Sequence, residues 1–285
     1  MRLTARILAS AAVAAVALTA TACGAGGGDD DAAPSDDKTT ISVGFNPGPY
    51  REYFEGGIVP LLEEAGFETE SIDFTDGITT NVALGDGDVD AVIMQHGVYQ
   101  TSINEQEGLS NSTLVLVPTA PMGLFGGASA TLDDVADGST VAVPNEPANM
   151  FRALRVLEKV GWVKLSDSID AATASPADIT ENVAGIELVP MENAQQVSSL
   201  QDVDYSVIQG NFIISGGLDL TEALELETLT EEFTVGVSVD EKNLDTPWAQ
   251  AIKDAFTSKE FYDYITSDSQ YDGYTIPADL QASGE

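Results

Sequence analysis

Short apolar segments with the pattern of strands alternate with helix-like segments from Thr40 to the end of this chain. Over residues 41–45, Ile, Val and Phe alternate with Ser and Gly, which is typical of a half-buried strand. Residues 50–65 follow a helical pattern that contains Pro60 as a break or kink and ends at Gly66. Further strands are expected at 71–74, 91–94, 113–118, 140–143, 186–189, 205–209 and 233–239, and further helices at 79–84, 98–107, 131–136, 148–160, 194–200 and from 246 to about 265. This alternation predicts an α/β fold with a parallel-type sheet.

Two loops, near 118–122 and 226–232, interrupt the pattern where the chain could pass between two lobes. We therefore expect one lobe to comprise residues 39–121 with 229–285, and the other to comprise residues 122–228. In proteins built this way, a ligand binds in the cleft between the lobes, at the C-terminal ends of strands.

The N-terminus has the three parts of a signal peptide. Arg2 and Arg6 provide positive charge, residues 7–18 are apolar, and small residues follow up to Cys23. The apolar run is too short for a membrane span, so residues 1–22 are predicted to be cleaved. The sequence Ala-Thr-Ala-Cys at 20–23 resembles the bacterial lipobox, which implies acylation of Cys23 and attachment to the extracytoplasmic face of the cell membrane. The alternative is an ordinary secretory signal with a chance cysteine.

Residues 23–38 are rich in Gly, Asp and Ser and contain no large apolar side chain. Such a composition cannot form a core, which predicts a disordered acidic tether between the lipid and the folded part.

The formal net charge of −36 excludes several classes of function. Nucleic-acid binding requires clustered Lys and Arg, and a basic face for anionic lipid is missing as well. Cys23 is the only cysteine and His96 the only histidine, so disulfides and zinc sites with several such ligands are not expected. We expect no metal and no cofactor.

Arg152 and Asn149 lie one turn apart at the start of a predicted helix, after the strand that ends near Pro144. Backbone N–H groups at such a junction favour an anion, and an arginine can hold a carboxylate with two parallel hydrogen bonds. These residues are therefore candidates for binding a carboxylate. The alternative is that Arg152 lies on the helix surface, paired with one of the many acidic residues.

Polar side chains also follow two other predicted strands. His96 and Tyr99 come after the strand that ends at Met94, and Gln209 and Asn211 come at the end of the strand over 205–209. Both groups could contact a polar ligand at the strand edge. The alternatives are that His96 is a structural hydrogen-bonding residue and that Asn211 caps the next helix.

Several short stretches, in order from about residue 40 to the end, together resemble one family. They are Phe45-Asn46-Pro47-Gly48-Pro49, Phe74-Thr75-Asp76, Gln95-His96, Pro121-Met122-Gly123-Leu124, Pro144-Asn145-Glu146-Pro147 with Asn149 and Arg152-Ala153-Leu154, and Gly210-Asn211. Behind a lipobox, this set resembles the NlpA/MetQ family of lipoproteins, which deliver methionine to an ABC importer.

The resemblance implies a two-lobed, periplasmic-binding-protein-like fold of type II, with a cleft that closes on a free amino acid. It implies that Arg152 and Asn149 hold the ligand carboxylate, and that His96, Tyr99 and the pair Gly210-Asn211 complete the site. It further implies an ABC importer permease as partner, a monomeric state, and neither a cofactor nor a catalysed reaction.

Four positions depart from the family pattern around the ligand side chain. Gly77 replaces a tyrosine, Met94 one of two phenylalanines, and Val235 and Gln209 two asparagines. The aromatic wall is therefore expected to be reduced, which predicts weak methionine binding or a preference for a bulkier or more apolar amino acid.

Two other functions remain open at this point. A secreted α/β hydrolase would need a Gly-x-Ser-x-Gly nucleophile elbow, which does not occur, and its triad would have to use His96. A structural or adhesive surface lipoprotein would need only the fold, with a vestigial cleft.

Overall fold

The computed structural model describes residues 38–284, which belong to one structural unit. The predicted signal peptide 1–22, Cys23 and all of the predicted tether except Lys38 lie outside the described residues. Within residues 38–284, no helix has the length and apolar character needed to cross a membrane.

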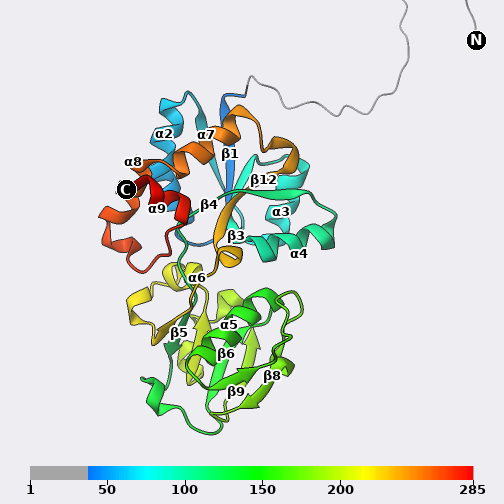
Figure 1. The fold of residues 1–285 in the computed structure, drawn as a ribbon, viewed down its shortest axis with the longest axis vertical. Coiled ribbons are helices and arrows are strands. Elements are labelled where there is room, and N and C mark those ends of the chain that lie inside the picture. The colour runs from blue at the N-terminus through cyan, green and yellow to red at the C-terminus, as the bar shows by residue number, and fades with distance from the viewer. Residues whose placement is uncertain (1–37, 285) are drawn as a thin grey trace, which may run out of the picture. The chain divides into compact units, whose positions relative to one another are not determined.

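The first sheet contains five strands in the order β2-β1-β3-β12-β4. The strands are β1 (Thr40–Phe45), β2 (Glu68–Asp73), β3 (Ala91–His96), β4 (Asn111–Leu116) and β12 (Val235–Asp240). β1 runs parallel to β2 and β3, whereas β12 lies antiparallel to both β3 and β4. The expectation of a parallel-type sheet is therefore wrong for β12. The reason is topological, because β12 enters this sheet from the opposite end, on the chain's return from the second sheet (Figure 1).

Helices cover both faces of the first sheet (Figure 1). They are α1 (Tyr50–Tyr53), α2 (Val59–Glu64), α3 (Gly77–Asp86), α4 (Gly97–Glu107), α7 (Pro247–Phe256), α8 (Lys259–Ser267) and α9 (Ala278–Gly284). A π-helical turn at Phe54–Ile58 joins α1 to α2 just before Pro60. Pro60 has no N–H group to donate to the preceding turn, and the wider π turn accommodates it without ending the helix.

The predicted C-terminal helix over 246–265 is two helices, so the single helix expected there is wrong. α7 ends at Phe256, and the Ser258 hydroxyl caps α8 by accepting the N–H of Phe261. A serine in this position satisfies an N–H group that the start of a helix would otherwise leave unpaired, which favours a new helix over continuation.

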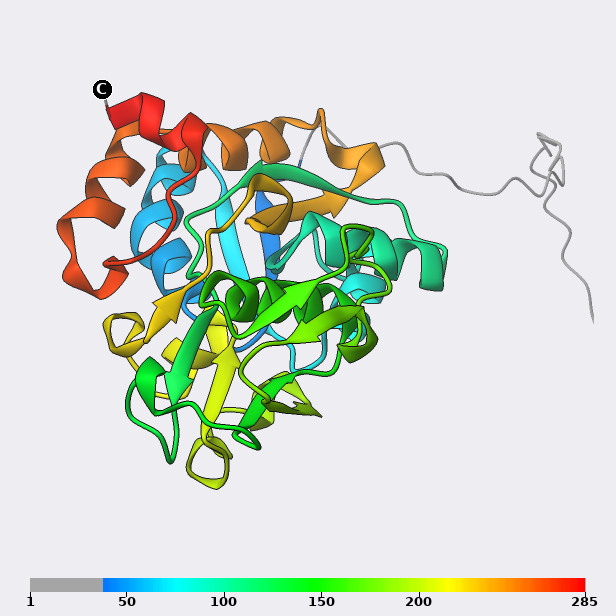
Figure 2. The same ribbon diagram turned by 60° about the horizontal axis from the view of Figure 1, so that its bottom comes forward.

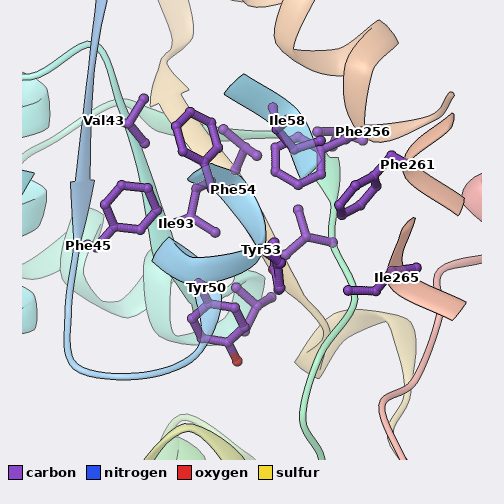
Figure 3. Close-up of a cluster of buried hydrophobic side chains, with 14 of the residues drawn as sticks. Val43, Phe45, Tyr50, Tyr53, Phe54, Ile58, Ile93, Phe256, Phe261 and Ile265 are labelled. Atoms are coloured by element: carbon purple, nitrogen blue, oxygen red, sulfur yellow. The ribbon is translucent and has the colours of Figure 1, made fainter. Parts of the chain in front are cut away.

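Aromatic side chains fill the core between these helices and the first sheet. Tyr53 and Phe54 lie among Phe256, Phe261 and residues of β1 and β3 (Figure 3). The ring centroids of Tyr53 and Phe261 are 5.8 Å apart, and those of Phe54 and Phe256 are 6.4 Å apart. Burial of large rings supplies much of the driving force for folding in a chain without a disulfide.

The second sheet has the order β11-β5-β10-β6-β9. Its strands are β5 (Gly123–Gly126), β6 (Thr140–Pro144), β9 (Glu187–Met191), β10 (Tyr205–Ile208) and β11 (Glu225–Leu226), and β7 (Val163–Leu165) pairs with β8 (Ile179–Asn182) beside it. β6 runs parallel to β9 and β10, whereas β5 is antiparallel to β10 and β11. This sheet is mixed as well, again contrary to the parallel expectation. Figure 2 shows its green and yellow strands together with α5 (Pro147–Lys159) and α6 (Gly210–Ser215).

Two predicted helices of this half are only short 3₁₀ turns, and β5, β7, β8 and β11 were not predicted. The segment 131–136 contains a turn at Leu132–Asp134, closed by a capping box between Thr131 and Asp134. The segment 194–200 lies across turns at Asn193–Gln195 and Leu200–Asp202. Its Gln196 is fully buried and donates its side-chain N–H to the Val207 carbonyl, so this polar stretch packs through a hydrogen bond and not through an apolar helical face.

The chain passes between the two sheets twice, through residues 117–122 and 227–234. The crossings lie side by side, because Val117 donates its N–H to the Val235 carbonyl and Val235 donates to the Thr119 hydroxyl. Two sheets, each with its own helices, form the predicted two-lobed α/β fold. We propose the lobe boundaries 39–121 with 229–285, and 122–228, and the membership of the two sheets supports this division.

Candidate functional site

A cavity of about 380 Å³ opens at the C-terminal ends of β1, β3, β6, β9 and β10. Residues that follow strands of both sheets line it. All nine residues predicted to bind the ligand lie in its wall: Gly77, Met94, His96, Tyr99, Asn149, Arg152, Gln209, Asn211 and Val235. The strand-end rule thus locates the cavity, because the side chains after each strand meet at one edge of each sheet.

The start of α5 positions Asn149 and Arg152. Pro147 occupies the first turn, and the Glu146 carboxylate caps the helix by accepting the N–H groups of Ala148 and Asn149 at 2.9 and 3.2 Å. These two N–H groups were expected to face a bound anion. Their acceptor is instead a carboxylate of the chain itself, so at this helix start the grip on an anion falls to side chains.

Arg152 is buried in the cavity wall, with 6% of its side chain exposed. Its Nε donates to Oε2 of Glu227 at 3.0 Å, and its Nη2 donates to Oε1 of the same carboxylate. Its Nη1 donates to the Asn149 Oδ1 at 3.1 Å. The alternative placed Arg152 on the helix surface, paired with an acidic residue. Arg152 does pair with an acid, but it lies inside the cavity wall.

The arginine keeps donors for a ligand. A guanidinium has five N–H groups, and the contacts with Glu227 and Asn149 engage one on each nitrogen. The two terminal nitrogens each retain one N–H group beyond these contacts with the described residues. These N–H groups, one on each terminal nitrogen, give two donors for the two oxygens of a carboxylate.

His96 caps α4 and completes the polar wall. Its Nδ1 accepts the N–H of Tyr99 at 3.2 Å, so Nε2 carries the proton toward the Asn149 Oδ1 at 3.3 Å. Burial lowers the pKa of His96 to about 3, and the Arg152 charge adds to this effect. The imidazole is therefore neutral. Because its nitrogens contact an amide oxygen and a backbone N–H group, it does not hold a serine for the triad that a hydrolase would need.

Tyr99 occupies the space that the glycine at position 77 leaves. A Cβ atom on Gly77 would lie 2.7 Å from the Tyr99 hydroxyl oxygen. The Tyr99 side chain from α4 therefore lies against position 77. The reduced aromatic wall expected from the family pattern stays a prediction, because the resemblance already gives the family a tyrosine at the position of Tyr99. Burial raises the pKa of Tyr99 to about 12, with Glu146 and Asp76 contributing, so the phenol is protonated.

The other predicted residues lie around these. Met94 is half-buried and packs against the apolar cluster under α3, and Val235 is buried in the wall next to the crossings. Gln209 occupies the N-cap position of α6, so the alternative that Asn211 caps this helix is wrong. Asn211 instead donates its side-chain N–H to the Pro47 carbonyl at 3.2 Å, which links α6 to the loop after β1.

Sequence reasoning gave no binding role to several polar residues of the cavity wall, among them Tyr50, Glu146 and Asn193, and it missed Glu227, which contacts Arg152. Tyr50 lines the cavity, and its burial raises its pKa above the ordinary value. Asn193 lines it after β9, and its buried Oδ1 has no hydrogen-bond partner among the described residues. The strand-end rule would have indicated Asn193, whereas nothing near Glu227 in the sequence indicates its contact with Arg152.

Among residues 38–284, no three His, Cys, Asp or Glu side chains gather in a way that could hold a metal ion. The arrangement is suited to holding a small polar ligand, with a carboxylate grip on one side and a partly apolar wall on the other.

Comparisons with known proteins agree with this architecture. A solved structure of a nutrient binding protein from Burkholderia cenocepacia, bound to methionine, is 31% identical with a TM-score of 0.77 and covers 83% of this chain and 99% of that one. A lipoprotein structure from Ruminococcus gnavus is 30% identical with a TM-score of 0.78, covering 84% and 99%. The D-methionine-binding lipoprotein MetQ of Salmonella typhi is 30% identical over 242 residues, which cover 83% of this chain and 84% of that protein. A model of the NlpA lipoprotein family matches residues 41–279, and the chain belongs to this family.

Proposed function

We propose that this chain is the substrate-binding lipoprotein of an ABC importer, and that it binds a free amino acid, methionine or a related one, in the cavity between its lobes. The observation that carries the proposal is Arg152, a buried arginine in the cavity wall with an N–H group left on each terminal nitrogen. A pair of donors held by Asn149 and Glu227 is pre-organised for a carboxylate, and this lowers the cost of binding.

The rest of the cavity fits the other groups of an amino acid. The Glu146 carboxylate and the Asn193 Oδ1, which has no partner within residues 38–284, are acceptors in the same wall and are suited to an ammonium group. Met94, Tyr99 and Val235 provide a surface of mixed apolar and aromatic character for the side chain. A cavity of about 380 Å³ is within the usual range for small-molecule sites.

Relatives support the choice of ligand and partner. Several are named D-methionine-binding lipoproteins, and one solved structure holds methionine. By this likeness, the partner is the permease of an ABC importer, and the protein releases its ligand unchanged, without catalysis or a cofactor.

We further propose that the mature protein is a monomer attached through acylated Cys23 to the extracytoplasmic face of the cell membrane, with no other contact to lipid or nucleic acid. Replacement of Cys23 by Ser should release the protein into the medium or leave it unprocessed. A Cys23→Ser protein that stays membrane-bound at mature size would contradict the anchor.

The test of binding is native mass spectrometry of freshly purified protein, followed by calorimetry with a panel of free amino acids. We expect a bound or titratable amino acid whose affinity falls in Arg152→Ala. Arg155→Ala is the matched control, because Arg155 is on the same helix, about half exposed, and stacks over Phe151 outside this cavity. If no free amino acid binds, or both variants lose binding equally, the proposal is wrong.

A further inference from the structure

Glu227 lies at a junction of three parts of the molecule. It belongs to the second crossing, it holds Arg152 of α5 with both carboxylate oxygens, and it accepts the N–H of Met122 in the first crossing. Only 8% of its side chain is exposed. A buried carboxylate in this position does more than fill space, because its full charge acts on the neighbouring guanidinium at low effective dielectric.

The charges that face the cavity are unbalanced. Among the described residues in the wall, Arg152 is the one cation, whereas Asp76, Glu146 and Glu192 are carboxylates. His96 adds no positive charge, because burial keeps it neutral. Since Glu227 already pairs with Arg152, the wall offers a ligand carboxylate hydrogen-bond donors without a surplus of positive charge.

This balance distinguishes ligands by net charge. A zwitterionic amino acid brings its own ammonium group, which the acidic wall stabilises while Arg152 donates to the carboxylate. A ligand with net negative charge brings a carboxylate with nothing to compensate it, next to four acidic side chains.

We propose that Glu227 is a specificity-determining residue. Its carboxylate neutralises the positive charge of Arg152, so that the site rejects ligands with a net negative charge. Glu227 acts through Arg152 and is a positioning residue in this role. The inference rests on the proposed function, since it names the charge class of the amino acids that the site accepts: neutral zwitterions and cationic amino acids, and not acidic ones.

The experiment compares two ligands that differ in one charged group. Methionine is the zwitterion, and its desamino analogue keeps the carboxylate and the side chain but lacks the ammonium group. Calorimetry gives the ratio of the two affinities for the wild-type protein, for Glu227→Gln and for Glu227→Asp. The glutamine keeps one acceptor oxygen, which can still accept from Met122 and the Arg152 Nη2, but it carries no charge and puts an NH2 group in place of the oxygen that accepts from the Arg152 Nε. The aspartate retains the charge.

Glu225→Gln is the matched control. It removes the same charge two residues away, where Glu225 pairs with Lys159 outside the cavity. Thermal melting of each variant reports whether it is folded.

In Glu227→Gln we expect the preference for methionine over its desamino analogue to fall by about tenfold, because an unpaired Arg152 attracts the anionic analogue more strongly. The ratio should stay at the wild-type value in Glu225→Gln and Glu227→Asp. Equal changes for both ligands in Glu227→Gln would overturn the proposal, since Glu227 would then be a general competitor for Arg152. A fall in both Glu227 variants would also overturn it, because geometry and not charge would be the cause.

The wild-type protein alone also tests the idea if Glu227→Gln does not fold. Affinities for the two ligands within about threefold of each other would show that there is no charge selection. That result leaves the proposed function intact, because methionine still binds, whereas a wild-type protein that binds neither ligand contradicts both proposals.

Discussion

The two walls of the cavity are built in opposite ways. On α5, Asn149 and Arg152 are buried and joined by hydrogen bonds to Glu146, His96 and Glu227. On the facing side, Gly77, Met94 and Tyr99 are partly exposed, and the Tyr99 hydroxyl has no hydrogen bond to another described residue. A satisfied buried network fixes one geometry, whereas a wall held by packing can change shape at small cost. By the proposed function, the constant part of an amino acid is expected to meet the rigid wall and the variable side chain the adaptable one.

Arg152→Ala removes the side chain at the centre of the rigid wall. It should have the largest effect on ligand affinity and on stability among the variants proposed here. Truncating one partner of a buried charge pair costs about 2–5 kcal/mol, so amino-acid affinity should fall by about thirtyfold to several thousandfold. Because Glu227 is left buried and unpaired, the free energy of unfolding should also fall, by about 3–5 kcal/mol. Calorimetry and chemical denaturation measure the two effects.

Addition of Glu227→Gln to Arg152→Ala should restore part of the lost stability and none of the binding, because it removes the unpaired charge but returns no donor. If the single variant is as stable as the wild type, the ion pair does not hold the rigid wall in the way we describe.

The rigid wall should also have a pH signature through His96. Its pKa is about 3 in the folded protein against 6.5 for a free side chain, so between these values the unfolded chain binds a proton that the folded chain does not. Stability should therefore decrease as the pH falls from about 6.5 toward 3, with a slope from this group of up to about 1.4 kcal/mol per pH unit.

His96→Asn isolates this group from the many carboxylates that titrate in the same range. Asparagine caps helices well and keeps an acceptor for the Tyr99 N–H group. The stability of the variant should depend less steeply on pH than that of the wild type. Parallel pH curves for the two proteins would mean that His96 is not held neutral.

Added volume in the adaptable wall should change the preference among amino-acid ligands more than it changes the stability of the protein. In Gly77→Ala the new Cβ meets the Tyr99 hydroxyl, and crowding of this kind costs about 1–3 kcal/mol where the neighbour cannot move. Because the contact is with the far end of a partly exposed side chain, Tyr99 should rotate away, with a loss at or below the lower end of that range. The shift should appear in a calorimetric panel of amino acids as a changed order of affinities.

A double-mutant cycle tests the cause. If Tyr99 fills the place of the side chain missing at position 77, Tyr99→Phe should relieve the effect of Gly77→Ala, with a coupling energy of about 0.5 kcal/mol or more. Additive effects would show that the two positions do not compete for the same space.

The same contrast explains what could be predicted from the sequence. Arg152 and Asn149 were found because a strand-to-helix junction is a local pattern, and β1, β3, β6 and β10 were found from apolar runs for the same reason. Glu227 was missed because it is 75 residues from Arg152 in the chain, and only the second crossing brings the two together. The antiparallel direction of β12 was missed for the same physical reason, since it depends on where the chain returns from the second sheet.

The contact of Tyr99 with position 77 also depends on tertiary packing, as the contact of Glu227 with Arg152 does. The sequence shows the missing side chain at that position, but the packing of α3 against α4 decides that Tyr99 occupies its space. The sequence thus indicated residues of both walls, whereas the packing of Tyr99 against position 77 and the contact of Glu227 with Arg152 depend on tertiary structure.

The smallest expected effects come from the helix caps of the two walls, and they sharpen the comparison by separating stability from binding. Asp76 caps α3 and Glu146 caps α5, each by accepting backbone N–H groups of the first turn. Replacing either by Ala should cost about 1 kcal/mol of stability, as loss of a helix cap commonly does.

Glu146 also accepts the side-chain N–H of Asn149 at 2.6 Å, whereas the Asp76 carboxylate bonds only to Thr79 in the set of described hydrogen bonds. Glu146→Ala should therefore also weaken amino-acid binding several-fold, in addition to lowering stability. The reason is that Asn149 loses a contact that orients it toward Arg152. Asp76→Ala should lower the melting temperature by a similar amount and weaken methionine binding less than Glu146→Ala does, because it removes one carboxylate of the wall but no contact of Asn149. Equal losses of affinity in the two variants would show that the two walls are equally rigid, contrary to the comparison drawn from their hydrogen bonds.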